Sequence, residues 1–218
     1  MAEVIQLGRT AAADPAARSV LERLAEEFRR NHWIRLGAIF EPAILQRVLA
    51  GIDAAAFDER VHEGIGPNRE LCLEPSPVVG LLHVLVNAEA LFALVEAVTG
   101  CAKIQSFQGR VYRVVPGCGH HDHWHDDMGN EKRLVAMSIN LSPVPYSGGT
   151  LQIRRKADRE SLQEVANIGL GDAIVFRLSR DLQHRISDVD GAHAKTAFAG
   201  WFRSDPVLRT SLASLRQG

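Results

Sequence analysis

The chain is poor in cysteine, and the three cysteines that it has are scattered. Cys72, Cys101 and Cys118 show no C-x-x-C spacing, which excludes a zinc-finger framework. An odd number of cysteines without a disulfide pattern favours a reducing compartment, so we expect a cytoplasmic protein. The N-terminal residues show no basic segment followed by an apolar one, and we therefore expect no secretory signal.

Excess charge and long apolar runs are also absent. The formal net charge is -1 over 218 residues, which argues against a surface for nucleic acid. No apolar run approaches the roughly 20 residues that span a membrane, so we expect no membrane contact. With 46% hydrophobic and 23% charged residues, the composition is that of an ordinary globular protein. The sequence carries no signal of the oligomeric state.

Helical patterns fill most of residues 1–100. A helix is expected over about residues 15–30, opened by Asp14-Pro15, and a second one from Pro42. A helical pair is expected over 78–86 and 88–99, with Asn87 as the cap of the second helix and Gly100 as its end.

Two other segments of this half are not helical. Residues 32–40 are aromatic and β-branched, which predicts a strand. Residues 57–77 are rich in Gly and Pro and show little periodicity, which predicts an irregular loop. Such a loop is either a lid over a site or a plain excursion into solvent.

From residue 104 the pattern changes to short alternating segments separated by Gly, Pro and Asp. Regularly spaced short strands predict a sandwich or closed barrel, and helices followed by strands predict an α+β fold in which the helices buttress a β core. No repeat or linker is visible, so we expect one domain over 1–218, with the active site in 104–203. The expected strands lie near 104–115, 134–142, 149–154, 164–168, 173–178, 183–187 and 195–203.

Histidines and carboxylates are concentrated in one short stretch. Residues 116–127 read PGCGHHDHWHDD, which places four of the nine histidines within six positions. The stretch ends in an H-x-D pattern, His125 and Asp127. In an extended segment residues i and i+2 point to the same face, so these two side chains can bind one ion. Neutral imidazole and carboxylate oxygen are both frequent metal ligands.

A third ligand must come from elsewhere, and His184 lies in another short alternating segment, 181–187. Two histidines and one carboxylate with open coordination positions form the facial triad of non-haem Fe(II) oxygenases. We therefore predict His125, Asp127 and His184 as iron ligands and catalytic residues. A 2-oxo acid can chelate iron at such a site and leave one position for O2, with the metal carrying the oxidation chemistry.

Other interpretations of the histidine-rich stretch exist. His120 and Asp122 form a second H-x-D pair that could bind the ion instead. Residues 121–126 resemble the H-x-H-x-D-H motif of metallo-β-lactamase-type zinc hydrolases, with the last two letters reversed. The third alternative is a non-catalytic jelly-roll binding module with a histidine-rich surface. Iron binding and 2-oxoglutarate consumption separate the oxygenase from both.

Lys195 begins the apolar segment 195–202, eleven residues after His184. A buried ammonium without an anion is costly, so a lysine here either remains in solvent or meets an anionic ligand. Alternation sends Lys195, Ala197, Ala199 and Trp201 to one face, and the two alanines leave room for a ligand. We expect Lys195 to hold the distal carboxylate of a dicarboxylic cosubstrate.

These residues together resemble a known family. His125, Asp127, His184 and Lys195, with VPG at 115–117 and GGTL at 148–151, are similar to the Fe(II)/2-oxoglutarate-dependent oxygenases of the prolyl-hydroxylase-like branch. The resemblance covers roughly residues 104–203. It implies a double-stranded β-helix (jelly-roll) core, the cofactors Fe(II), 2-oxoglutarate and O2, and release of succinate and CO2. Since Asp127 keeps the third protein ligand, the family pattern favours hydroxylation or a related oxidation over halogenation.

The chain departs from that family at two positions near the cosubstrate. Val115 and Asn140 stand where many prolyl hydroxylases have tyrosines, and Asn140 can still hydrogen-bond a carboxylate. Arg113 is a candidate to face the cavity and bind cosubstrate or substrate. Trp201 and His123 are candidate substrate contacts. The expected substrate is a small molecule, a free amino acid or a peptidyl residue whose C–H bond is hydroxylated.

Overall fold

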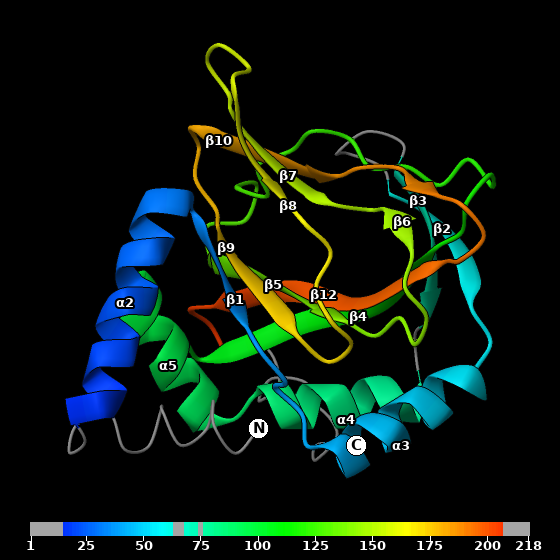
Figure 1. Ribbon diagram of the computed structural model, residues 1–218, viewed down its shortest axis with the longest axis horizontal. Helices are drawn as coiled ribbons and strands as arrows, with labels where there is room; N and C mark the ends of the chain where they lie inside the picture. Colours follow the sequence, from blue (N-terminus) through cyan, green and yellow to red (C-terminus); the bar gives the residue numbers. More distant parts are fainter. Residues whose placement is uncertain (1–14, 63–67, 74–75, 207–218) are drawn as a thin grey trace, which may run out of the picture.

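The computed structural model describes residues 15–62, 68–73 and 76–206 (Figure 1). The chain forms helices against one face of a large antiparallel sheet and a small sheet against the other. The helices are α2 (Pro15–Asn31), α3 (Pro42–Asp53), α4 (Pro77–Val86) and α5 (Glu89–Thr99). The strands are β1 (Trp33–Leu36), β2 (Asp58–His62), β3 (Asn68–Leu73), β4 (Ser106–Val114), β5 (Arg133–Asn140), β6 (Ser147–Gly148), β7 (Leu151–Arg155), β8 (Ser161–Val165), β9 (Ala173–Arg177), β10 (Leu182–Ile186), β11 (Val189–Asp190) and β12 (Lys195–Arg203).

Seven strands form the major sheet, in the order β1-β9-β5-β12-β4-β3-β2. The minor sheet has the order β10-β7-β8 and lies across from β9, β5 and β12 (Figure 1). Within the described residues the strands of these two sheets, and those of the two-stranded sheet β11-β6, pair antiparallel. The α+β prediction is therefore confirmed.

Alternation along β12 and β4 divides the side chains between two environments. Phe107, Phe198 and Phe202 are 0% exposed and belong to the core that the major sheet forms with the helices. Burial of such a side chain contributes about 1.5–3 kcal/mol. The alternate residues, such as Ala199 and Trp201, line a cavity on the other face of the sheet. The helices thus support the sheet from behind and leave its inner face for a site.

Close packing behind the sheet requires glycine at Gly200. A Cβ added there would lie 2.0 Å from the backbone oxygen of Gln108 and 2.4 Å from the Cα of Gly109. Gly109 in turn donates its N–H to His83 Nε2 at 3.2 Å. His83 thus joins α4 to the centre of β4.

The predicted helices match the structure with small shifts. Gly100 ends α5 with a left-handed φ of 67°, as its role as the end of the helix requires. Asn87 is not the N-cap of α5, because that position is Ala88. Its side-chain amide instead donates to Phe107 O and its carbonyl accepts from Phe107 N, which joins the α4–α5 connection to β4. Asp14 lies outside the described residues.

The prediction of an irregular loop over 57–77 is wrong for most of its length. Residues 58–62 and 68–73 form β2 and β3, which extend the major sheet beyond β4. The physical reason is that an edge strand is stabilised by backbone pairing and needs no apolar alternation. Gly64, Gly66, Pro67 and Pro75, which suggested the loop, lie outside the described residues. The strand expected over 32–40 is also shorter, since β1 ends at Leu36.

Within the described residues no single helix is long and apolar enough to cross a membrane. Taken together, α4 and α5 have the length and composition of a membrane-spanning helix, but the chain bends by 58° between them.

Candidate functional site

Three donor groups from distant parts of the chain converge at one end of the cavity. The ligand atoms of His125, Asp127 and His184 all lie within 4.8 Å of one another. Asp127 Oδ2 is 3.7 Å from His125 Nε2 and 3.4 Å from His184 Nε2. Two imidazole nitrogens and one carboxylate oxygen in this arrangement are the donor set of a facial iron triad, so the residues present fit a divalent iron ion.

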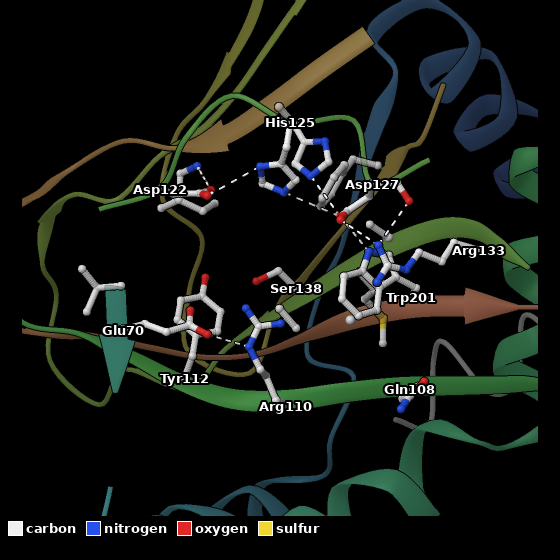
Figure 2. Close-up of a pocket in the computed structure, with 18 of the residues that line it drawn as sticks. Glu70, Gln108, Arg110, Tyr112, Asp122, His125, Asp127, Arg133, Ser138 and Trp201 are labelled. Atoms are coloured by element: carbon white, nitrogen blue, oxygen red, sulfur yellow. Dashed lines mark hydrogen bonds and ion pairs between the residues drawn. The ribbon is translucent and has the colours of Figure 1, made fainter. Parts of the chain in front are cut away.

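Backbone contacts fix the positions of these three side chains. His125 N donates to His184 O at 3.1 Å, and His184 N donates to His125 O at 2.8 Å, so the two histidines form an isolated bridge beside the minor sheet. Asp127 follows with a φ of 59°, in the left-handed region that aspartate tolerates better than most residues. This turn returns the carboxylate toward the two imidazoles (Figure 2).

Hydrogen bonds orient the ligand atoms. His125 Nδ1 lies 2.7 Å from His123 O, so it carries the proton and leaves Nε2 free for a metal. The Asp127 carboxylate accepts from Trp201 Nε1 at 2.7 Å and from Arg133 Nη1 at 2.9 Å. These two bonds hold the carboxylate beside His125 (Figure 2) and His184.

The protonation states suit metal binding. Burial alone would raise the pKa of Asp127, but the hydrogen bond with His184, the adjacent His125 and the Trp201 N–H hold it well below its usual value. Burial lowers the pKa of His184. At neutral pH the aspartate is therefore ionised and His184 is neutral, which is the state that binds a metal ion.

The triad opens into a cavity of about 450 Å³ between the two sheets. Its floor is the inner face of β4, β12 and β5, where Gln108, Arg110, Tyr112, Ser138 and Ala199 contribute side chains. The wall near the triad includes Trp201 and Phe176. A cavity of this size accommodates a small organic ligand.

Lys195 lies in a narrower cleft that adjoins this cavity and shares Ser138, Phe176 and Ile186 with it. The lysine is 6% exposed, its Nζ donates to Gly149 O, and the Tyr146 ring centroid is 5.7 Å away. No carboxylate among the described residues forms a salt bridge with it. Burial lowers the pKa of Lys195 to about 8. The structure thus places the ammonium inside the protein, where an anionic ligand would stabilise it.

Asn140 lines the same cleft, but its amide already has partners. Its Nδ2 donates to Ile168 O at 2.7 Å, and its Oδ1 accepts from Ser142 N at 3.0 Å. These bonds hold the two connections that flank the cleft. A direct contact between Asn140 and the cosubstrate stays a prediction.

The expectation that Arg113 faces the cavity is not met. Arg113 Nε donates to Thr196 Oγ1 at 2.9 Å, and its guanidinium carbon lies 4.1 Å from the Phe57 ring centroid. Arg113 pairs with Thr196, while Tyr112 pairs with Ala197 on the opposite face. The error came from taking Val115 as a position of the strand that faces inward. β4 ends at Val114, and its even-numbered residues face the cavity.

The histidines that precede His125 take other positions. His120 is buried, and its Nδ1 accepts the Val115 N–H at 2.9 Å. Asp122 Oδ2 accepts the Ile186 N–H at 2.8 Å, so the second H-x-D pair contributes to folding. His123 is exposed and stacks edge-on against His121, with ring centroids 4.8 Å apart. It does not line the cavity, whereas Trp201 does.

Several cavity residues were missed at the level of sequence. Arg133 stacks on the Trp201 ring at 3.6 Å while it binds Asp127. Arg110 and Tyr112 stand on the floor, and burial raises the pKa of Tyr112, so its hydroxyl stays neutral. The alternation of β4 could have found the last two, because apolar Phe107 and Val111 mark the face turned to the helices.

Replacing Trp201 with phenylalanine is expected to weaken binding of a divalent ion. The change keeps an aromatic ring beside Arg133 but removes the N–H that donates to Asp127. Loss of such a partner costs about 10- to 100-fold in metal affinity, which titration with Mn(II) would measure. Trp33→Phe is the matched control, since Trp33 Nε1 contacts Gln163 and not a residue of the triad. Equal Mn(II) affinity in Trp201→Phe and the wild type would contradict the role of this hydrogen bond.

Comparison with known proteins agrees with this geometry. Residues 107–203 match the 2OG-Fe(II) oxygenase superfamily. No sequence among curated proteins matches the chain. The matched segment begins in β4 and ends with β12, so it contains the whole triad and Lys195.

Solved structures are similar over most of the chain. An oxidoreductase of the 2OG-Fe(II) oxygenase family from Burkholderia pseudomallei has a TM-score of 0.65 at 15% identity, covering 84% of this chain and 90% of that one. A Pseudomonas putida prolyl-4-hydroxylase has a TM-score of 0.58 at 20% identity, covering 85% of this chain and 99% of that one. A Trichoplax adhaerens prolyl hydroxylase was solved with a hypoxia inducible factor peptide fragment. It has a TM-score of 0.62 at 16% identity, covering 91% of this chain and 98% of that one. The expected double-stranded β-helix core is confirmed.

Proposed function

We propose that the chain is a member of the 2OG-Fe(II) oxygenase superfamily, which its residues 107–203 match, and we assign a role to each residue of its site. It is a dioxygenase that uses Fe(II), 2-oxoglutarate and O2. In our proposal His125, Asp127 and His184 hold the iron, and Lys195 holds the distal carboxylate of 2-oxoglutarate. Iron bound there supplies the reduction of O2 coupled to oxidative decarboxylation of 2-oxoglutarate to succinate and CO2.

The protein side chains orient these reactants and keep their charges in place. His125 presents Nε2 because its Nδ1–H donates a hydrogen bond to His123 O. The Asp127 carboxylate is held in one orientation because Trp201 and Arg133 donate to its two oxygens. These contacts remove rotational freedom from the ligands before any ion binds, which favours one ligand geometry.

Lys195 supplies the charge for the other end of the cosubstrate. A buried ammonium whose hydrogen-bond partner is a backbone carbonyl is poorly compensated, and a carboxylate beside it would restore the balance. The cleft around Lys195 adjoins the triad cavity through Ser138, Phe176 and Ile186. A short dicarboxylic acid would therefore reach from the triad toward the lysine.

The affinity for 2-oxoglutarate is expected to fall as the pH rises above about 8. Burial lowers the Lys195 pKa to about 8, so the free enzyme loses the ammonium above that pH and with it the charge that binds the carboxylate. Titrating the Mn(II) enzyme with 2-oxoglutarate between pH 6.5 and 9.5 measures the effect. Lys195→Arg keeps its charge over this range and is expected to lose the pH dependence. A wild-type affinity that stays constant to pH 9.5 would contradict the assignment.

The substrate is proposed to be a small molecule, an amino acid or a peptidyl residue. The cavity of about 450 Å³ suits such a ligand. Prolyl hydroxylases are among the structures with a similar fold, and the complete facial triad supports hydroxylation of a C–H bond.

Convergence of the three donor atoms within 4.8 Å supports this function most directly. The test is an assay for succinate from 2-oxoglutarate with Fe(II), ascorbate and air. Succinate formation that requires both Fe(II) and O2 is the expected result. Formation of no succinate, or activity supported equally by Zn(II), would contradict the proposed function.

A further inference from the structure

Arg110 lies at the centre of the cavity floor. It pairs with Ala199 of β12, and Ala199 pairs with Ser138 of β5, so the three form one row across the inner face of the sheet. The two neighbours are small and leave space above the guanidinium. Figure 2 shows the Arg110 side chain rising from β4 beside Ser138, with His125 and Asp127 across the cavity.

One carboxylate orients this arginine. Arg110 Nε donates to Glu70 Oε1 at 2.6 Å, and Glu70 is 8% exposed. Burial alone would lower the Arg110 pKa, but the adjacent Glu70 carboxylate raises it overall, so the guanidinium stays charged. Because Glu70 binds Nε, the terminal edge of the guanidinium, between the two Nη nitrogens, is left for another partner.

The two Nη nitrogens of Arg110 have no hydrogen-bond partner among the described residues. Other arginines that line the cavity differ in this respect, since Arg69, Arg133 and Arg203 each place an Nη nitrogen on a carboxylate. The Arg110 side chain is 24% exposed, and it lines the cavity. Its outer edge is thus a planar pair of donors open to a ligand.

We propose that the substrate of this enzyme is an organic acid whose carboxylate binds the Nη pair of Arg110. This inference rests on the proposed function, which it deepens by naming the class of substrate. A planar guanidinium edge matches the two oxygens of a carboxylate in a bidentate pair. The arginine guanidinium keeps its positive charge at every pH at which the enzyme is folded, so the site favours an anionic ligand at each of them.

The sheet register separates this anion site from the proposed 2-oxoglutarate anchor. Lys195 pairs with Val114, four residues along β4 from Arg110, which corresponds to about 13 Å between the two backbone positions. Trp201, which binds Asp127, pairs with Gln108, only two residues from Arg110. Arg110 is therefore nearer the end of the floor that carries the triad, where a substrate must place its reacting carbon.

The experiment measures whether a carboxylate is preferred over its amide. The Mn(II) enzyme saturated with 2-oxoglutarate, which fills the Lys195 site, is titrated with the L-amino acids, their N-acetyl derivatives and the matching primary amides. At least one acid is expected to bind about 10- to 100-fold more tightly than its amide, as loss of a charged hydrogen-bond pair predicts.

Arg110→Lys tests the donor pair with little risk to folding, because the ammonium still pairs with Glu70. This variant is expected to lose the preference for acid over amide. Arg110→Met combined with Glu70→Gln removes both charges together and is expected to do the same. Arg113→Met is the matched control, since this arginine of the same strand points to the opposite face and is expected to keep the wild-type preference.

The outcomes distinguish this proposal from the function on which it rests. If Mn(II) or 2-oxoglutarate fails to bind the wild type, the proposed function is wrong. If both bind but no acid is preferred over its amide, the organic-acid proposal is wrong and the oxygenase assignment stands. A preference that persists in both Arg110 variants also overturns it, because the carboxylate then binds elsewhere.

Discussion

Replacing His184 with alanine is expected to lower 2-oxoglutarate turnover by more than about a hundredfold. Removing a residue that only hydrogen-bonds to a metal ligand already lowers metal affinity or activity by about 10- to 100-fold. His184 is one of three donors, and two donors do not form the facial site. The fold is expected to survive, since the backbone bonds between His184 and His125 do not depend on the imidazole. Succinate formation and Mn(II) titration measure the two losses, and circular dichroism measures the fold.

An exposed histidine provides the control for this variant. His193 lies outside the cavity lining, so His193→Ala is expected to keep wild-type turnover and metal affinity. Normal succinate formation by His184→Ala would remove His184 from the metal site. Loss of the circular dichroism signal would instead assign the imidazole a role in folding.

Replacing Lys195 with methionine is expected to raise the dissociation constant for 2-oxoglutarate by about a hundredfold or more, the scale for losing one partner of a buried charge pair. The maximal rate at saturating 2-oxoglutarate is expected to change less, because an anchor remote from the reacting bond contributes mainly binding. Titration of the Mn(II) enzyme and steady-state kinetics measure the two effects. Lys103→Met is the control, since that side chain is 78% exposed.

The same variant should be more stable than the wild type when no ligand is bound. The Lys195 pKa is lowered from 10.5 to about 8, so the unfolded chain binds the proton more tightly than the folded one. Below about pH 8 folding therefore buries a charged ammonium, which lowers the free energy of unfolding. Wild-type stability rises with pH between about 8 and 10.5, because the unfolded chain binds the proton more tightly over this range. A higher melting temperature of Lys195→Met at pH 7 is expected. A large loss of stability would show that Lys195 mainly holds Gly149.

The β core and the triad could be predicted because their signals are local. The H-x-D pattern predicted the correct pair, His125 and Asp127, although the left-handed turn at Asp127, and not an extended segment, brings the two side chains together. The alternation of 195–202 predicted which residues of β12 share a face, since both faces of that strand are buried against different partners. The α+β arrangement followed in the same way from the change in periodicity near residue 104.

Other features depend on contacts between distant segments, which no local pattern encodes. β2 and β3 form because the edge of β4 offers backbone partners, although residues 58–62 have no apolar alternation. The face of Arg113 depends on where β4 ends, which is set by pairing with Lys195 and Thr196. The hydrogen bond between Trp201 and Asp127 joins residues 74 positions apart, and no sequence pattern near either residue predicts it.

The Arg110–Glu70 pair illustrates the same limit within the site. The two residues are 40 positions apart, and Glu70 belongs to the segment that was expected to be a loop. Only the pairing of β3 with β4 brings the carboxylate to the guanidinium. The charge of the cavity floor is therefore a property of the folded sheet.

In the proposed site His125, Asp127 and His184 bind one iron ion beside a cosubstrate held by Lys195. A crystal structure of the enzyme with Fe(II) and 2-oxoglutarate, prepared without oxygen, would show this arrangement. We expect one ion coordinated by these three side chains and chelated by the oxo acid, with the distal carboxylate on Lys195 Nζ. An ion bound instead by His120, His121 or His123, or a carboxylate far from Lys195, would contradict it.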